Sequence, residues 1–534
     1  MFAADFTVTS TADSGPGTLR QALVDAATNP GPDNIFFNIS DVPARITLNS
    51  SLTIGSAVVI DGYTQPGTTQ GPVSARQVLV SLNFNAIDNG PAPAAYDGLI
   101  ITTGNVTVRG LAIYRANRAI VLNGTAGTGG AVRIQGNIIG LDEFNSNFVE
   151  DPISGEVANT RNGSHGVFFA TTSTGFVIPR VFLGVDGDGT NDANEGNLIT
   201  NNGQDGVFLN NADYNVIAGN FIGTRETGTL IGVTNTNNNG ITFDGTNLGD
   251  GCSNNRIGTD GNGVSDALEG NVVSGNRKNG IVLQRRGTAN QIAGNTIGIT
   301  PVGGVPAGNG RIVSGTPPVF ITEGNGILLN NVSGNIIGVN PTGGVAAQRN
   351  FISSNFHNGI TLYSSATGSN GFVQNNIVAG NTIGSNLAGD NRGNLKWGVF
   401  LTNTATSSLV FNNFIGSNDD GSGDNLEGNT IVYNQRDGVG LLDQSTDFVI
   451  ENRISRNSMF GNNRPGAGSE GYGLGINLMP TITDGTTPNS GAGTGPNFLY
   501  NFPVTVDFKV NTGSSEVEVT GSSPSGAFVQ YYIA

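Results

Sequence analysis

The chain of 534 residues has little cysteine, little charge and no long apolar run. Its one cysteine, Cys252, excludes an intrachain disulfide and leaves the redox compartment open. Charged residues make up 12% of the chain, too few for a helical protein surface, whereas the 37% apolar content is too high for disorder. No apolar run reaches the ~18 residues of a membrane span. We therefore expect a long folded chain without a membrane span.

Positive charge is also scarce, because 24 Lys and Arg residues face 40 Asp and Glu residues, for a net charge of -16. This balance argues against nucleic acid or an anionic membrane as partner, since a phosphate backbone requires a basic footprint. It favours divalent cations instead. The start, MFAADFTV, lacks the basic and apolar regions of a signal peptide, so we expect a mature chain from which that peptide was removed.

A short motif of Asn or Asp, Gly and an apolar residue recurs between about residues 166 and 442. Its glycines are about 40 residues apart, at Gly166, Gly206, Gly240, Gly280, Gly326, Gly359, Gly398 and Gly438. A second motif, Gly-Asn-x-Ile-Gly, lies between most of them, so we interpret the repeat as two coils of about 20 residues. Strands of three to five residues with Gly or Asn at each corner are typical of a β-solenoid. We expect the corner asparagines to stack into ladders.

The two ends of the chain differ from the repeat. Residues 14–31 predict an amphipathic helix that covers the open end of the solenoid, with a capping box of Thr18 and Gln21. Its apolar stripe consists of Leu19, Ala22, Leu23 and Ala26. From about residue 498 longer strands alternate at period two, which is typical of an antiparallel β piece. We interpret this piece as the start of a further module.

Three segments carry a resemblance to a known family: TADSGPGTLRQAL (11–23), IDGYTQPG (60–67) and GLIITTGNVTVRGLAIYR (98–115), together with the repeated GNxIG and EGNxIS segments. They resemble exported bacterial right-handed parallel β-helix repeat proteins, of the CSLREA-type, polymorphic outer-membrane and pectate-lyase-like kind. The CSLREA string itself is absent. The resemblance implies a right-handed parallel β-helix and a secreted or cell-surface location.

The predicted fold class is therefore all-β. We expect an N-terminal cap over residues 1–40, a right-handed parallel β-helix over 41–497, and the start of a β-sandwich-like module over 498–534. At about 20 coils, and ~4.8 Å per coil, the β-helix would be about 95 Å long.

Three acidic segments align without a gap: 184–197, 258–271 and 416–429. Each has Asp or Asn at its third and fifth positions, Asp at its ninth and Glu at its twelfth. Oxygen ligands on a glycine-rich loop suit calcium, although the same residues also cap ordinary turns. The candidate metal ligands are Asp186, Asp188, Asp192 and Glu195; Asp260, Asn262, Asp266 and Glu269; and Asn418, Asp420, Asp424 and Glu427.

Catalytic signals are weak. A lyase would need a basic residue near a cation. The candidates are Arg277, Lys278, Arg285 and Arg286, which could share a groove with segment 258–271 or could simply be solvated. His165 and His357, the two histidines, lie beside corner glycines and are interpreted as turn variants.

Because every conspicuous polar group recurs from coil to coil, whereas a catalytic site is a single constellation, the leading hypothesis is a non-catalytic, adhesin-like extracellular scaffold. It would bind glycans or other surface proteins and calcium. One alternative is a polysaccharide lyase or glycoside hydrolase acting in a groove of the β-helix. Another is a sheath or fibre component that self-associates through its ends.

Overall fold

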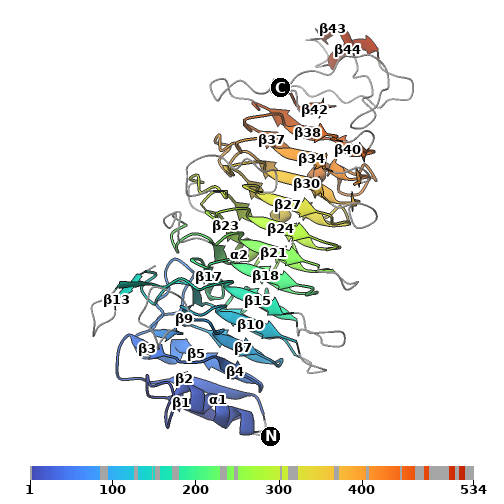
Figure 1. The fold of residues 1–534 in the computed structure, drawn as a ribbon. Coiled ribbons are helices and arrows are strands. Elements are labelled where there is room, and N and C mark those ends of the chain that lie inside the picture. Colours follow the sequence, from blue (N-terminus) through green and yellow to red (C-terminus); the bar gives the residue numbers. More distant parts are fainter. Residues whose placement is uncertain are drawn as a thin grey trace.

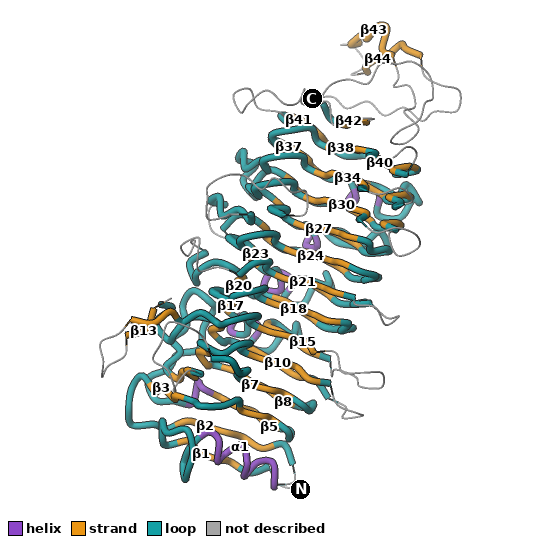
Figure 2. The backbone as a smooth tube through the Cα atoms, viewed as in Figure 1, coloured by secondary structure: helices purple, strands orange, loops and turns teal. Residues whose placement is uncertain are grey.

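The computed structural model describes most of the chain. Described are residues 3–29, 31–84, 94–124, 130–146, 148–150, 157–170, 180–228, 237–245, 251–300, 304–310, 323–365, 372–404, 408–444, 448–462, 474–479, 504–511 and 516–522. Three long parallel sheets, here named A, B and C, contain 13, 12 and 12 strands, and they run side by side along an elongated body (Figure 1). Their short strands alternate with turns around the body (Figure 2).

Sheet A contains β1 (Asp5–Val8), β2 (Asp33–Phe37), β5 (Val58–Asp61), β8 (Val106–Arg109), β11 (Val132–Gln135), β16 (Val181–Gly184), β19 (Val216–Ala218), β22 (Arg256–Gly258), β25 (Gln291–Ala293), β28 (Ile336–Gly338), β32 (Ile377–Ala379), β36 (Phe414–Gly416) and β40 (Arg453–Ser455). Sheet B contains β3 (Ala44–Thr47), β6 (Val80–Asn83), β9 (Leu111–Tyr114), β12 (Ile138–Ile139), β17 (Leu198–Ile199), β20 (Phe221–Ile222), β23 (Val272–Val273), β26 (Thr296–Ile297), β29 (Phe351–Ile352), β33 (Thr382–Ile383), β37 (Thr430–Val432) and β41 (Ser458–Phe460).

Sheet C contains β4 (Leu52–Ile54), β7 (Leu99–Ile101), β10 (Ile120–Asn123), β15 (Val167–Ala170), β18 (Val207–Asn210), β21 (Ile241–Asp244), β24 (Ile281–Gln284), β27 (Ile327–Asn330), β30 (Ile360–Ser364), β34 (Val399–Asn403), β38 (Val439–Leu442) and β42 (Ile476–Met479). A smaller parallel sheet joins β31 (Val373–Gln374), β35 (Val410–Phe411) and β39 (Val449–Ile450). Two antiparallel pairs complete the described strands: β13 (Phe148–Glu150) with β14 (Val157–Asn159), and β43 (Val504–Asn511) with β44 (Glu516–Ser522).

Each coil visits sheets C, A and B in turn, as β18, β19 and β20 do before β21 pairs in parallel with β18. Val207 lies opposite Ile241, so this coil takes about 34 residues. The prediction of 20-residue coils was therefore wrong, because the two Asn-Gly motifs that resemble each other lie at different corners of one coil. The β-helix has 12 to 13 coils and is about 60 Å long at ~4.8 Å per coil.

Alternation within the strands builds the core. In β18, Val207 and Leu209 point inward and are fully buried, whereas Phe208 between them faces outward. The parallel register places equivalent residues of successive coils side by side, so Ile241 and Phe243 of β21 continue the inner rows of Val207 and Leu209. One continuous apolar cluster results, which runs from Val8 to Val449 in the described part of the chain.

An asparagine ladder follows each of the three corners, as expected from the sequence. In each ladder the side-chain Nδ2 of one asparagine donates to Oδ1 of the asparagine one coil further on. The A–B ladder consists of Asn137, Asn197, Asn220, Asn271, Asn295, Asn350, Asn381, Asn429 and Asn457. The B–C ladder consists of Asn162, Asn202, Asn237, Asn276, Asn309, Asn355, Asn394, Asn434 and Asn462. The C–A ladder consists of Asn215, Asn255, Asn290, Asn335, Asn376, Asn413 and Asn452.

The predicted N-terminal helix is present as α1 (Leu19–Thr28), which packs against β1, β2 and β4. All four residues of its predicted apolar stripe are buried. Thr18 Oγ1 accepts a hydrogen bond from the backbone N–H of Gln21, but the Gln21 side chain donates to Asp25 instead of returning to Thr18. In the predicted cap region, β1 pairs with β2 and β2 pairs with β5, so sheet A begins within residues 1–40.

Sheet B also contains a strand outside the repeated motif. Within residues 68–97, β6 pairs with β3 and β9. The sequence of β6, Val-Ser-Leu-Asn, is not followed by the repeated Asn-Gly motif, so that motif does not predict this strand. The described helices include none long and apolar enough to cross a membrane.

Candidate functional site

The three predicted acidic segments are loops at the A–B corner, named here loop I (184–197), loop II (258–271) and loop III (416–429). Each follows a strand of sheet A and leads into the next strand of sheet B. In each loop, one carboxylate oxygen from each of three residues lies within 4.8 Å of the others: Asp186, Asp192 and Glu195; Asp260, Asp266 and Glu269; Asp420, Asp424 and Glu427. The structure therefore brings together nine of the twelve predicted ligands.

Much of the acidic pattern caps the loop backbone. Glu195 Oε2 accepts from the N–H of Asp186 at 3.1 Å, and Glu269 and Glu427 make the same bond to Asp260 and Asn418. The fifth-position residue of each loop also caps a turn. In loops I and II this residue lies outside the carboxylate cluster, and in loop III it belongs to it. Asp188, Asn262 and Asp420 each accept a bond of 2.7 Å from the N–H two residues further on.

A fourth loop at the same corner, loop IV (338–350), contains no carboxylate and shows that this capping needs no negative charge. Gln348 stands two residues before the ladder asparagine, as the glutamates do, and its Oε1 accepts from the N–H of Asn340 at 3.1 Å. An amide oxygen thus replaces a carboxylate oxygen. The repeated glutamate is explained by backbone capping before any ligand is invoked.

The acidic loops differ in their basic partners. In loop II, Arg256 Nη1 lies 2.7 Å from Glu269 Oε1 and 3.7 Å from Asp260 Oδ2. In loop III, Arg456 Nη2 lies 3.3 Å from Asp424 Oδ2. In loop I, Arg133 contacts Asp186 at 2.7 Å, but no basic side chain of the described residues pairs with Asp192 or Glu195. Burial raises the pKa of Glu195 to about 7, and the neighbouring Asp186, Asp192 and Asp188 raise it too.

The predicted basic cluster is divided between two corners. Arg277 and Lys278 precede β24 at the B–C corner, whereas Arg285 and Arg286 follow it at the C–A corner. Lys278 pairs with Glu323 at 2.9 Å and Arg285 pairs with Asp244. Loop II lies at the third corner. The structure therefore does not place this cation candidate and these bases in one groove.

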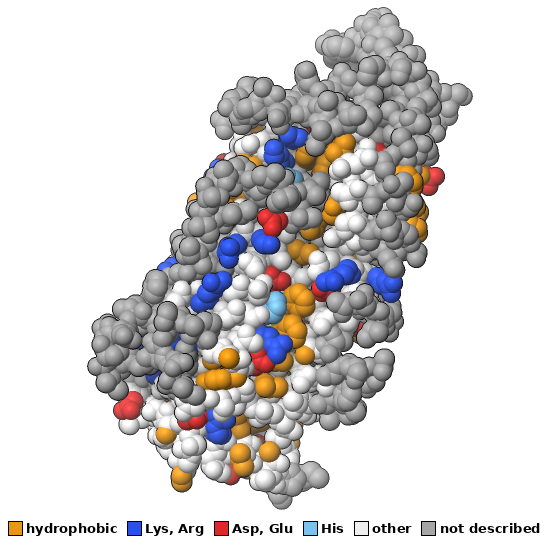
Figure 3. All heavy atoms as spheres, viewed as in Figure 1, with side chains coloured by type: hydrophobic (Ala, Val, Ile, Leu, Met, Phe, Trp, Pro, Cys, Tyr) orange, Lys and Arg blue, Asp and Glu red, His pale blue; other side chains and the backbone are white. Residues whose placement is uncertain are grey.

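Basic side chains gather instead along the B–C corner. Lys and Arg residues of this corner include Arg118, Arg161, Arg277, Lys278, Arg392, Lys396 and Arg436. Figure 3 shows Lys and Arg side chains along one border of the visible part of sheet C, from about the level of β10 to that of β38. We call this set the basic stripe. Its members are scattered in the sequence, and they align only when the correct coil length is known.

The centre of the basic stripe is electrostatically unbalanced. Burial and the charge of Arg277 lower the pKa of the Arg161 guanidinium. The Nε atoms of both arginines are buried, and neither finds a hydrogen-bond acceptor among the described residues. Two like charges with unused donors are an arrangement that an anion would stabilise.

An aromatic column adjoins the basic stripe. The rings of Phe168 and Phe208 are stacked at 5.6 Å, His165 lies 4.7 Å from Phe208, and the Arg118 guanidinium lies 4.4 Å from the centre of Phe168. Burial, helped by the charge of Arg118, lowers the pKa of His165 to about 4. His165 Nδ1 accepts from the N–H of Asp205 at 3.3 Å, so the imidazole is a neutral corner residue, in line with its interpretation as a turn variant.

His357 is likewise buried at the B–C corner, where its Nδ1 lies 3.3 Å from Asn325 Oδ1. Burial, with Lys396 and Arg436 nearby, lowers the pKa of His357 to about 3. Neither histidine is placed as a general base at neutral pH.

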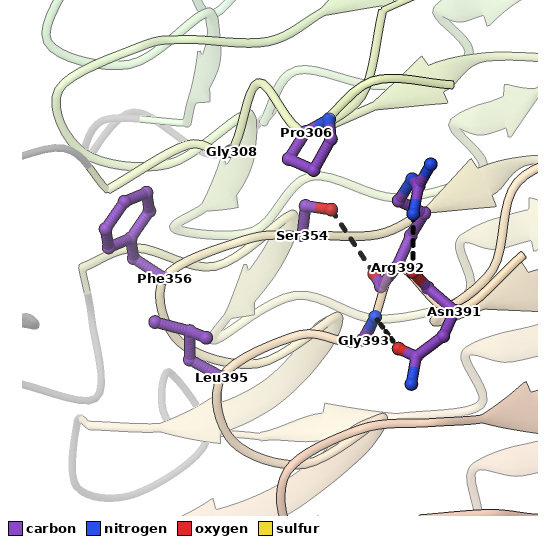
Figure 4. A pocket seen from close by; sticks show the side chains of 8 residues that line it. All are labelled: Pro306, Gly308, Ser354, Phe356, Asn391, Arg392, Gly393 and Leu395. Carbon is purple, nitrogen blue, oxygen red and sulfur yellow. Dashed lines mark hydrogen bonds between the residues drawn. The ribbon is translucent and has the colours of Figure 1, made fainter. Parts of the chain in front are cut away.

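A cleft of about 460 Å³ opens at the same corner (Figure 4). Phe356 and Leu395 give it an apolar side, and Arg392 lies across from them. Arg392 Nε donates to Gly304 O at 2.7 Å, and Ser354 Oγ donates to Arg392 O at 3.4 Å. No carboxylate and no histidine is among the eight residues that line it, so the cleft can hold a ligand but offers no acid–base pair.

One unrepeated ionisable cluster was missed from the sequence. On the outer side of sheet B, Arg45 pairs with Glu143, and Tyr114 and Asp142 lie beside them. Burial raises the pKa of Asp142 to about 6 and raises that of Tyr114 as well. Tyr114 is fully buried and the side chain of Glu143 is inaccessible, so solvent reaches this cluster mainly at Arg45, whose side chain is 30% exposed.

Similarity to known proteins is found at the level of structure and not of sequence. No family model matches the sequence, and no curated protein is significantly similar to it. The structure is similar to the periplasmic alginate epimerase AlgG, with 11% identity, a TM-score of 0.36, and coverage of 81% of this chain and 80% of that chain. For the A-module of an Azotobacter vinelandii mannuronan C-5 epimerase the values are 10%, 0.33, 91% and 100%, and for an alginate lyase from Paenibacillus sp. str. FPU-7 they are 10%, 0.30, 89% and 99%.

These similarities concern the fold alone. The three parallel sheets, which each coil visits in turn, define the molecule as a right-handed parallel β-helix protein, as the resemblance in the sequence implied.

Proposed function

We propose that the protein is a non-catalytic extracellular scaffold that binds an acidic polysaccharide along the basic stripe. The observation that carries this proposal is the Arg161–Arg277 pair, two partly buried like charges whose Nε donors have no acceptor among the described residues. Carboxylate groups would supply both the charge and the acceptors. The acidic remainder of the surface would confine such a polymer to the stripe.

The shape of the stripe supports a polymer over a small anion. Its basic residues extend over many coils, each separated from the next by ~4.8 Å. The cleft at Arg392 adds an apolar side of Phe356 and Leu395, against which a sugar ring could pack while the guanidinium faces an acidic group. Charge, spacing and apolar contact therefore point to the same class of ligand.

Binding of sodium polygalacturonate, measured by calorimetry in low salt, tests the proposal. Arg161→Ala and Arg277→Ala should each weaken binding about tenfold, equivalent to ~1.4 kcal/mol. Arg180→Ala is the matched control, since Arg180 is an exposed arginine at the C–A corner and its loss changes the net charge equally. An unaffected double variant, or an equal loss in the control, would contradict a stripe-specific site. Binding of neutral dextran with the same affinity would contradict the role of charge.

A polysaccharide lyase or glycosidase is the second candidate, favoured by the one unrepeated cluster of Arg45, Tyr114, Asp142 and Glu143. Ultraviolet absorbance for unsaturated uronates and an assay for reducing ends, run on the same mixtures, separate the candidates. Product that disappears in Glu143→Gln would replace the scaffold proposal with an enzyme.

A further inference from the structure

Among the A–B corner loops, a matching rule links the second and ninth positions. In loop II, Thr259 Oγ1 donates to Asp266 Oδ1 at 3.0 Å, and in loop III, Ser417 Oγ donates to Asp424 Oδ1 at 2.9 Å. Loop IV has Val339 at its second position and no carboxylate in its remaining residues. In these three loops, an aspartate at the ninth position occurs together with a hydroxyl residue at the second position. The loop with valine at the second position has no aspartate at the ninth.

Loop I breaks this rule. It has Val185 at its second position, yet it retains Asp192 at its ninth. Asp192 Oδ2 accepts from the N–H of Gly189 at 3.1 Å, but Oδ1 is buried and has no hydrogen-bond partner in the described part of the chain. Asp192 is 4% exposed, so water in the bulk does not solvate this oxygen. A buried carboxylate oxygen without a donor is costly, which points to a ligand that completes the loop.

The charge of loop I supports the same conclusion. Asp192 and Glu195 are both buried, and neither has a basic partner among the described residues, whereas Arg256 and Arg456 reach the corresponding carboxylates of loops II and III. Arg133 neutralises only the outer carboxylate, Asp186. In loop II the guanidinium of Arg256 thus supplies a positive charge at the place where loop I has none.

We propose that loop I binds one hard divalent cation through Asp186, Asp192 and Glu195, and that loop II, with its own arginine, does not. All the side chains offer oxygen, which suits Ca²⁺, and the remaining positions of its coordination shell are available to loop carbonyls or water. The cation stiffens the A–B corner on the opposite side of the coil from sheet C. This site is independent of the basic stripe.

Equilibrium dialysis of the EGTA-treated protein against CaCl₂, with MgCl₂ in parallel, tests the site. We expect one Ca²⁺ per chain and a rise in the melting temperature on binding. Asp192→Asn should reduce the affinity at least thirtyfold and abolish the rise. Asp266→Asn, the same change at the same position of loop II, should leave both unchanged.

A second variant guards against misfolding of the first. Val185→Thr supplies the hydroxyl that loops II and III possess, so it should raise the melting temperature without calcium and weaken Ca²⁺ binding several-fold. Failure to bind either cation, binding that survives Asp192→Asn, or equal losses in the Asp192 and Asp266 variants would each overturn the proposal.

Discussion

The A–B and B–C corners share the same frame, a buried asparagine ladder, and differ in the polar side chains that lie outside it. Both carry a buried ladder of asparagines from coil to coil. Above the A–B ladder the polar residues recur, and most of them are consumed by capping the loop backbone. Above the B–C ladder the basic residues do not recur at a fixed spacing, and Arg161 and Arg277 leave donors unused. The recurring, mostly satisfied groups of the A–B corner support the fold, and the unsatisfied donors of the B–C corner are the ground for the proposed polysaccharide site.

If the two corners share one frame, an asparagine of either ladder should contribute equally to the free energy of unfolding. Asn271→Ala at the A–B corner and Asn276→Ala at the B–C corner each remove an amide that bonds to both neighbouring coils. Each should lower the free energy of unfolding by about 4 kcal/mol, because buried donors and acceptors lose their partners. Denaturant unfolding measures both variants. A clearly smaller loss at one corner would show that the frames are not equivalent, and Asn238→Ala, in a partly exposed pair with Gln204, serves as the mild control.

Acid sensitivity separates the corners further. His165 has a folded-state pKa of about 4, below the ordinary 6.5, so between these values the unfolded chain binds a proton that the folded chain does not. Stability should therefore fall as the pH falls from 6.5 to 4, by roughly 2 kcal/mol at pH 5. His165→Asn introduces an asparagine, as other coils have at the equivalent positions Asn239, Asn279 and Asn325. This variant should lack the loss of stability between pH 6.5 and pH 4 that is due to His165. An unchanged pH profile of the unfolding midpoint would contradict a buried neutral imidazole.

Capping by the repeated glutamates predicts the smallest effect. Glu427→Gln keeps an oxygen that can accept from the N–H of Asn418, as Gln348 does for Asn340, so the unfolding free energy should change by less than about 1 kcal/mol. Glu427→Ala, which removes the acceptor, should cost more. Thermal unfolding of the pair decides the matter: equal destabilisation by both variants would mean that the charge of Glu427, and not its oxygen, supports loop III.

The sequence predicts well those features that depend on local chemistry. Alternating apolar residues, α1 with its buried stripe, and the asparagine ladders all follow from short segments and were correctly predicted. The coil length was not, because the Gly-Asn motif serves two corners of one coil and the repeat was halved on that account. Loops I to III were found by internal alignment, but whether their carboxylates cap the backbone or remain unpaired depends on contacts such as Thr259 with Asp266.

Groups that meet only through the coil were beyond the sequence. Arg277 and Arg285 are eight residues apart and seemed to form one cluster, but β24 lies between them and carries them to different corners. Arg161 is more than a hundred residues from Arg277, yet the two influence each other in the fold. A wrong coil length shifts every such alignment, which is why the basic stripe was missed.

Long and short A–B turns alternate strictly from β16 to β40, and the two kinds are bonded to each other. The short turns at Gly219, Gly294 and Gly380 each donate their N–H to the carbonyl of Glu269, Gln348 or Glu427, at the end of the next long loop. A Cβ at Gly219 would lie 2.4 Å from the Val185 side chain of the preceding loop, so the turn is held from both sides. The structural repeating unit at this corner is thus a pair of coils. Gene segments that encode one coil should be poor building blocks for lengthening this rod, whereas segments that encode two should splice into it without a seam.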